Sequence, residues 1–191
     1  MRIILVRHGE TEYNVKGLAQ GWCDSPLTKK GIKQAQNAAN LLAYENIDLV
    51  LCSDTNRAIT TTSIINQDIE IHTDPRIREM HYGECFEAKP NWHKNLFLIF
   101  HPFSQYHHVG GENTKDVIKR FSELIDELYL SYPRSTILIV SHGGLLSNFI
   151  IRKCILDLIY KQKFFIFTKN ASINILNYDG KRYSVECLNR R

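Results

Sequence analysis

The spacing of apolar positions predicts strands and helices in alternation along the chain. Residues 2–6 and 136–140 each contain a wholly apolar run of the kind found in strands buried on both faces of a sheet. Residues 114–130 instead carry apolar side chains at every third or fourth position, which is the spacing of a helix with one buried face. The same criteria predict helices over 28–44, 55–65 and 145–155, and strands over 48–52, 69–72, 172–178 and 181–188.

This order of elements predicts a three-layer α/β/α fold around a mostly parallel sheet. Strands that alternate with helices favour parallel pairing, with helices covering both faces. Asp179-Gly180 suits a tight turn between the last two strands, so we expect a hairpin at the C-terminal edge. A single domain over 1–191 accounts for the length. Residues 80–113 break the alternation and are rich in aromatic and histidine side chains, and we expect them to form a cap inserted over a pocket.

Composition narrows the choice of partner and compartment. The chain is 43% hydrophobic and 23% charged, with a formal net charge of +4, which suits an anionic small molecule and is too mild to favour nucleic acid. No apolar run is long enough to cross a bilayer, and a strand is expected directly after Met1, without a signal peptide. The five cysteines lack Cys-x-x-Cys spacing, which argues against a disulfide framework or a zinc cluster. We therefore expect a cytoplasmic protein with reduced thiols, no membrane partner and no metal.

Two His-Gly pairs follow two of the predicted strands, and each leads into a helix-like stretch. His8 comes directly after the first strand, and His142 follows the later, equally apolar one. Because ligands of a parallel sheet bind at the carboxyl ends of its strands, both histidines can face one pocket. An unprotonated imidazole at His8 is a suitable nucleophile toward phosphorus. His142 is then a candidate donor to a phosphate oxygen, and Gly143 and Gly144 allow backbone amides to approach the same anion.

Three charged residues complete the candidate site. Arg7 adjoins His8, and Arg57 lies near the start of a predicted helix, where a guanidinium opposes the helix dipole unless an anion is present. Both arginines can neutralise a phosphoryl group and favour the neutral form of His8. Glu79 is a candidate proton donor to the leaving oxygen, and an ordinary ion pair with neighbouring arginines is the alternative interpretation of this residue.

Together these motifs resemble the histidine phosphatase superfamily, in its phosphoglycerate mutase-like branch. The resemblance is carried by Arg7-His8-Gly9-Glu10-Thr11 with Asn14, Gln20-Gly21, Pro26-Leu27-Thr28, Ser53-Asp54, Arg57-Ala58, Glu79, Ser141-His142-Gly143-Gly144 and Asn170-Ala171-Ser172-Ile173. It implies that His8 becomes a phosphohistidine and that Glu79 serves as acid and base. Arg7, Arg57 and His142 would bind the phosphoryl group, and further substrate contacts would come from Thr11, Asn14, Gln20, Gly21 and Gly143.

The resemblance leaves the substrate open. Residues 84–88 depart from the Trp-Glu-Gly stretch common in small phosphatases of the family, and Gly111-Glu112-Asn113 departs from Gly-Glu-Ser. We expect a metal-independent phosphatase that acts on a small phosphorylated metabolite without a cofactor, and homodimer formation is an open option. The nearest alternatives are a phosphoglycerate-type mutase and, as the specific activity, an α-ribazole phosphatase. Remoter ones are a non-catalytic binding protein and a metal site formed in the cap by His101, His107 and His108.

Overall fold

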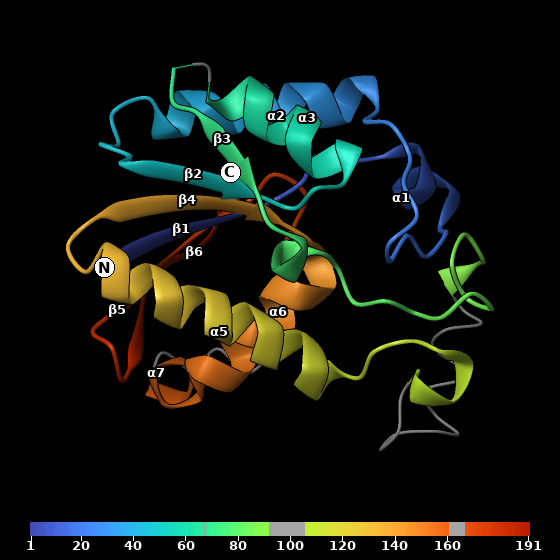
Figure 1. The fold of residues 1–191 in the computed structure, drawn as a ribbon. Coiled ribbons are helices and arrows are strands. Elements are labelled where there is room, and N and C mark those ends of the chain that lie inside the picture. The colour runs from blue at the N-terminus through green and yellow to red at the C-terminus, as the bar shows by residue number, and fades with distance from the viewer. Residues whose placement is uncertain (67, 92–105, 161–166) are drawn as a thin grey trace.

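The computed structural model describes residues 1–66, 68–91, 106–160 and 167–191, and its sheet lies between two layers of helices (Figure 1). Six strands of the described residues form the sheet in the order β3-β2-β4-β1-β5-β6. The first four in this order are parallel, β5 is antiparallel to β1, and β6 is antiparallel to β5. The strands are β1 Arg2–Arg7, β2 Leu49–Cys52, β3 Ile71–Thr73, β4 Thr136–Ser141, β5 Ile173–Tyr178 and β6 Tyr183–Arg190. The predicted fold, with its hairpin edge, is confirmed.

The helices cover both faces of the sheet, with α2 and α3 on one side and α5, α6 and α7 on the other (Figure 1). Within the described ranges they are α1 Glu12–Lys16, α2 Lys29–Leu42, α3 Asn56–Ile65, α5 Thr114–Ser131, α6 Gly143–Lys153 and α7 Ile155–Tyr160, with 3₁₀ turns η1 Pro75–Ile77 and η2 His107–Val109. The side chains of β1 alternate between the two layers. Ile3 and Leu5 pack into the core that includes α5 and α6, whereas Ile4 and Val6 pack into the core that includes α2 and α3. Burial on both faces explains why this strand is wholly apolar.

Side-chain hydrogen bonds set two of the element ends, and one predicted helix has other bounds in the structure. Thr28 caps α2, because its Oγ1 accepts a hydrogen bond from Gly31 N at 3.0 Å. The helix predicted over 145–155 instead begins at Gly143 and breaks at Cys154, and α7 follows as a separate short helix. The predicted hairpin is present, but its loop comprises residues 179–182 because Asp179 Oδ1 accepts hydrogen bonds from the two backbone amides that follow Gly180.

The predicted cap over 80–113 falls partly on residues 92–105, which lie outside the described residues. Its described first part runs beside the loop that follows α1. Ala88 N donates to Ala19 O, and Ala19 N donates to Lys89 O, both at 2.8 Å. A cap function for the whole segment stays a prediction. In the described part of the chain, no helix is both long and apolar enough to cross a membrane.

Phe149 tests the packing between α5, α6 and the C-terminal hairpin. Its ring is fully buried and lies edge-to-face against Phe121 and Tyr183, with centroids 4.7 and 5.3 Å away. Replacing Phe149 with alanine leaves a cavity and should lower the free energy of unfolding, measured by urea denaturation, by about 3–5 kcal/mol. Leu156→Ala, at an exposed position of α7, should change it by less than about 0.5 kcal/mol. Equal losses for the two variants would contradict this packing.

Candidate active site

The two His-Gly pairs lie side by side at the carboxyl ends of β1 and β4. These strands are parallel neighbours, with Arg7 opposite Ser141 in register, and His8 N donates to Ser141 O at 2.9 Å. The centroids of the His8 and His142 rings are 5.3 Å apart. The fold thus brings the two motifs together at the strand ends where ligands of parallel sheets bind.

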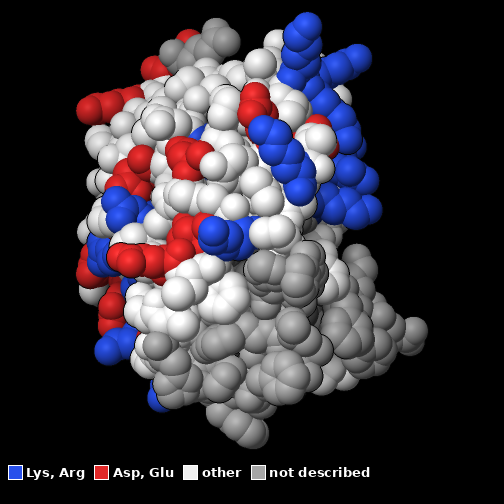
Figure 2. Space-filling view, turned by 90° about the vertical axis from the view of Figure 1, so that its right-hand side faces the viewer, with Lys and Arg blue, Asp and Glu red and all other residues white. Residues whose placement is uncertain are grey.

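A cavity of about 470 Å³ opens beside His8. Among the residues predicted for the site, its walls include Arg7, His8, Asn14, Gln20, Gly21, Arg57, Glu79 and Gly143. The remaining walls are Leu18, Ala19, Tyr82, Asn91, Gly144, Ser147, Asn148, Phe167 and Thr168. Thr11 and His142 are fully buried and lie outside this lining. On the face that carries the strand ends, Lys and Arg gather along one margin, and Asp and Glu lie among further Lys and Arg along the other (Figure 2). The positively charged side chains in the cavity walls are Arg7 and Arg57.

His8 is held as a neutral imidazole with a free lone pair on Nε2. Nδ1 lies 2.8 Å from Gly9 O, and a carbonyl only accepts, so the Nδ1 proton is donated to it. Burial, together with the nearby Arg57 and Arg7, holds the pKa of His8 well below its ordinary value. Gly9 has no room for a side chain, because a Cβ would lie 2.5 Å from Gly31 O. The close packing of the segment after β1 against the first turn of α2 fixes the ring beside the cavity.

His142 has the opposite tautomer. Its Nδ1 accepts from Nε and Nη2 of Arg57 at 3.3 and 3.1 Å, and a guanidinium only donates. Burial and the Arg57 charge hold the pKa of His142 well below its ordinary value, so the ring is neutral and its proton is on Nε2. This Nε2–H is buried without a hydrogen-bond partner among the described residues. It is a donor suited to an anionic oxygen.

Arg7 lies against the start of α6. Its Nη1 donates to Thr168 O at 2.9 Å, while its Nε is a second buried donor that lacks a partner within the described ranges. A Cβ at Gly143 would come within 3.0 Å of the guanidinium. Gly143 therefore allows the close approach of Arg7, which places the guanidinium in the cavity wall.

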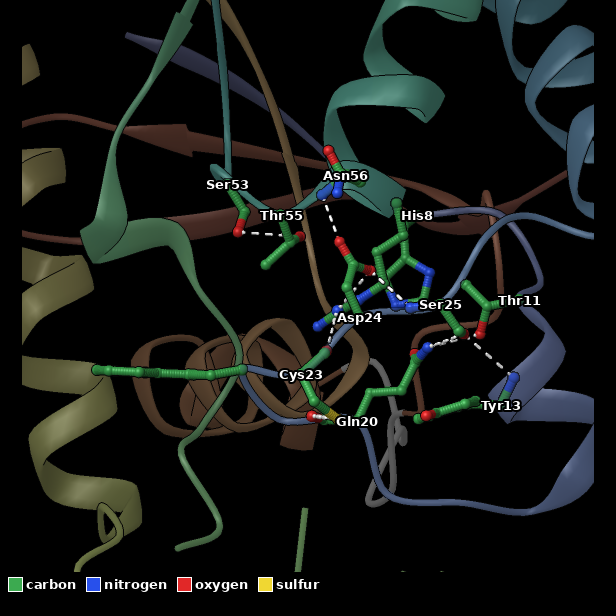
Figure 3. Close-up of polar contacts among 12 residues, drawn as sticks. His8, Thr11, Tyr13, Gln20, Cys23, Asp24, Ser25, Ser53, Thr55 and Asn56 are labelled. Atoms are coloured by element: carbon green, nitrogen blue, oxygen red, sulfur yellow. Dashed lines mark hydrogen bonds and ion pairs between the residues drawn. The ribbon is translucent and has the colours of Figure 1, made fainter. Parts of the chain in front are cut away.

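Arg57 is fully enclosed by polar groups. Besides His142, its donors reach Gly21 O and Cys23 O, each at 2.7 Å, and Asp24 Oδ1 at 3.0 Å. Asp24 also accepts from Asn56 N at the first turn of α3 (Figure 3). The anion that the helix dipole requires near Arg57 is thus supplied by the protein. Direct binding of a phosphoryl group by Arg57 stays a prediction.

Glu79 caps the N-terminus of α6. Oε1 accepts from Met80 N at 2.9 Å and Leu145 N at 2.8 Å, and Oε2 accepts from Gly144 N at 2.7 Å. The Gly144 amide, which we expected to face a bound anion, is therefore directed at this carboxylate. A Cβ at Gly144 would lie 2.7 Å from Oε1, so the contact requires glycine. This cap also explains why α6 begins earlier than its apolar pattern predicts.

Sequence reasoning missed the residues that hold Glu79. The Arg120 side chain donates to the backbone oxygens of Arg76, Arg78 and Glu79 at 2.6–2.9 Å, and pairs with Glu112 at 2.8 Å. Trp22 Nε1 also donates to Glu79 O, at 2.9 Å. The only sequence signal for this group was Glu112, which lies in the motif Gly111-Glu112-Asn113.

Thr11, Asn14 and Gln20 form one hydrogen-bonded group beside the cavity. Thr11 Oγ1 accepts from Asn14 N at 3.2 Å. It also accepts from Gln20 Nε2 at 2.9 Å (Figure 3). Gln20 Nε2 also donates to Ser25 Oγ, and Asn14 Oδ1 accepts from Asn170 Nδ2 at 3.1 Å. Asn14 and Gln20 line the cavity, whereas Thr11 supports both side chains from outside it. Their contacts with a substrate stay predictions.

The alternative of a metal site in the cap rests on three histidines. His107 Nε2 lies 2.7 Å from Asp116 Oδ2, whereas His101 and the side chain of His108 lie outside the described residues. Among the side chains that the structure describes, no group of three or more His, Cys, Asp or Glu is placed to hold a metal ion.

Comparison with known proteins places this geometry in a family. Residues 3–191 match the histidine phosphatase superfamily (branch 1), and the chain belongs to this family. The adenosylcobalamin/alpha-ribazole phosphatase of Salmonella typhimurium is 35% identical over 159 residues, which cover 80% of this chain and 79% of that protein. The resemblance stated from the sequence is confirmed.

Solved structures of phosphatases share the fold. A mycobacterial glucosyl-3-phosphoglycerate phosphatase, at 27% identity, aligns with a TM-score of 0.85 over 100% of this chain and 99% of its own. The alpha-ribazole phosphatase from Shigella flexneri, at 29% identity, aligns with a TM-score of 0.82 over 99% of this chain and 96% of its own. The site described above therefore lies in a fold shared with proteins that are named as phosphatases.

Proposed function

We propose that this protein is a metal-independent phosphatase that hydrolyses a small phosphorylated metabolite through a phosphohistidine at His8. The observation that carries the proposal is the geometry at His8, a neutral imidazole whose Nδ1 is bound to Gly9 O and whose Nε2 keeps its lone pair beside the cavity. Splitting phosphoryl transfer into two displacements is an established use of such a nucleophile.

In the first step, Nε2 of His8 attacks phosphorus while the bond to the ester oxygen breaks, and Glu79 gives that oxygen its proton. In the second step, water attacks the phosphohistidine, Glu79 takes a proton from the water, and inorganic phosphate leaves His8 neutral again. A carboxylate has about four acceptor positions. Backbone amides occupy three of them at Glu79, so one remains for the transferred proton.

Two buried donors would stabilise the phosphoryl group during transfer. Arg7 Nε and His142 Nε2–H both lack a partner among the described residues, and both belong to side chains at the ends of β1 and β4. Donors that are already oriented in a low-dielectric site stabilise developing charge without a reorganisation cost. Arg57 adds positive charge beside both histidines.

For the substrate, we infer a monophosphate ester of a small polar metabolite, with α-ribazole phosphate as the first candidate. The relative from Salmonella typhimurium is named for that activity. In the described walls of the cavity, the amides of Asn91 and Asn148 and the hydroxyl of Ser147 provide hydrogen-bonding groups for such a leaving group.

The proposal is tested by hydrolysis of p-nitrophenyl phosphate in excess EDTA, followed by a panel that includes α-ribazole phosphate, sugar phosphates and 3-phosphoglycerate. We expect chelator-resistant release of phosphate. Isomerisation of 3-phosphoglycerate without release of phosphate would contradict the phosphatase and favour a mutase. Loss of activity in EDTA that returns with a divalent metal would contradict the metal-independent mechanism.

The lowered pKa of His8 predicts activity in mildly acid solution. The nucleophile must be neutral, so kcat/KM falls as pH drops through the pKa of His8 in the free enzyme. An ordinary histidine places that fall at about pH 6.5. Because burial and the two arginines lower this pKa, kcat/KM should stay level down through that pH and fall only below it.

The measurement is a pH profile of kcat/KM with two substrates whose phosphates have different pKa values. A fall in kcat/KM caused by ionisation of the enzyme occurs at the same pH with both substrates, whereas a fall caused by ionisation of the substrate does not. A fall centred at about pH 6.5 with both substrates would contradict the depressed pKa of His8.

A further inference from the structure

The loop over residues 21–24 encloses the Arg57 guanidinium. Gly21 O and Cys23 O accept from its two terminal nitrogens, and Asp24 Oδ1 accepts from Nη1 at 3.0 Å. The remaining donors point to His142 Nδ1. All five N–H groups of Arg57 therefore have acceptors, which fixes the plane of the guanidinium.

Asp24 is the charged member of this shell. Within the described residues, Arg57 forms an ion pair with Asp24. The Arg57 side chain is 0% exposed and the Asp24 side chain is 24% exposed. A buried guanidinium is costly without a counter-ion, because its charge loses the hydration that it has in water. The same carboxylate accepts from Asn56 N and Ser25 N, so Asp24 itself is fixed to the start of α3 (Figure 3).

The orientation of Arg57 decides which nitrogen of His142 carries the proton. Two guanidinium donors face Nδ1, so the neutral ring must carry its hydrogen on Nε2. The other neutral tautomer would leave a lone pair on Nε2, which repels a phosphoryl oxygen instead of donating to it. A rotated guanidinium would remove this preference.

We propose that Asp24 is a positioning residue of the phosphoryl site, whose carboxylate holds Arg57 in the orientation that keeps the His142 proton on Nε2. The kinetic consequence of this proposal rests on the proposed function. Asp24 acts through Arg57 and His142, without contact with the substrate. Asp24 lies outside the walls of the cavity beside His8, which accords with an indirect role.

Asp24→Asn is the variant that tests it. An asparagine keeps one acceptor oxygen, so it can still accept from Ser25 N or from Asn56 N but not from both, and the negative charge against Arg57 is lost. We expect kcat to fall about 10- to 100-fold, by analogy with the loss of groups that orient metal-ligating histidines. KM should stay level or fall, because the site becomes more positive toward an anionic substrate. Asp24→Glu restores the charge and should recover part of kcat.

Glu45→Gln is the matched control. Glu45 also pairs with an arginine, Arg2, at 2.6 Å and is 22% exposed, but this pair lies away from the cavity. Thermal unfolding of both variants separates a loss of stability from a loss of turnover. The proposal would be overturned if kcat of Asp24→Asn fell only as far as its loss of stability explains, and if Glu45→Gln lost kcat and stability to the same extent. Asp24 would then have only a structural role.

Nitrogen-15 NMR of the histidine rings gives a readout that needs no turnover, with the His142 signals assigned from their loss in His142→Gln. The wild type should show the Nε2–H tautomer at His142, and Asp24→Asn should shift it toward a mixture. An unchanged tautomer with kcat within about twofold of wild type would overturn the proposal. If the wild type hydrolyses no phosphate ester, the proposed function fails, while the tautomer comparison still decides the role of Asp24.

Discussion

Replacing His8 with alanine is expected to abolish turnover of every phosphate ester that the wild type hydrolyses. The variant loses the Nε2 lone pair that forms the covalent intermediate, and the remaining donors have no nucleophile to assist. Removal of a covalent nucleophile typically costs at least about 10⁴-fold in kcat. The measurement is phosphate release in EDTA, together with rapid quenching at alkaline pH to trap labelled phosphohistidine in the wild type. The label should be absent from His8→Ala.

His72→Ala serves as the control, because His72 is an exposed histidine on β3. Its activity and its phosphohistidine signal should equal those of the wild type. Retention of the trapped label in His8→Ala would assign the nucleophile to another residue and reject the proposed mechanism.

Replacing Glu79 with glutamine should produce the second largest loss, and the loss should depend on the leaving group. A glutamine cannot transfer a proton, and general acid–base catalysis contributes about 10²- to 10⁴-fold. Alkyl phosphates need a proton on the departing oxygen, so their hydrolysis should suffer most. p-Nitrophenyl phosphate leaves as a stabilised anion, so the formation of phosphohistidine from it should be least affected. Single-turnover kinetics on both substrates measures this step.

Glu123→Gln provides a control at an exposed glutamate of α5 and should not change either rate. Since Glu79 also caps α6 through the amides of Gly144 and Leu145, the unfolding free energy of Glu79→Gln should be measured alongside. Equal rate losses for alkyl and p-nitrophenyl esters would indicate that the substitution displaces the helix start, and would reject the role of Glu79 as an acid.

Much of the fold could be predicted because its signals are local. β1 and β4 are buried on both faces, and complete burial of a strand appears in the sequence as an unbroken apolar run. The helix α5 buries one face, so its apolar residues recur with the helical period. One of the boundaries that differed depends on a distant group. The start of α6 is set by a carboxylate from another segment, which no window around Gly143 contains.

In the candidate site, too, the features set by neighbouring residues could be predicted, and those set by distant residues could not. Arg7 and His8 could be placed together from sequence because they are adjacent, and His142 could be placed at the same sheet edge because it also follows a buried strand. The clamp that Arg120, Glu112 and Trp22 form around Glu79 was missed, because α5 and the residues just before it, the segment after α1 and Glu79 itself are far apart in sequence. These segments meet only in the folded chain.

The sequence by itself thus determined the strands, the longer helices, the family motifs and the candidate nucleophile, since each of these follows from residues that are neighbours or repeat at a fixed spacing. It did not predict the short helices α1 and α7. The tertiary structure alone decided which nitrogen of each histidine carries the proton, and where the donors of Arg57 and the acceptors of Glu79 are directed. The physical reason is that hydrogen-bond partners and burial depend on which atoms meet in space. The chemistry of this site is therefore set by contacts that form only after the chain has folded.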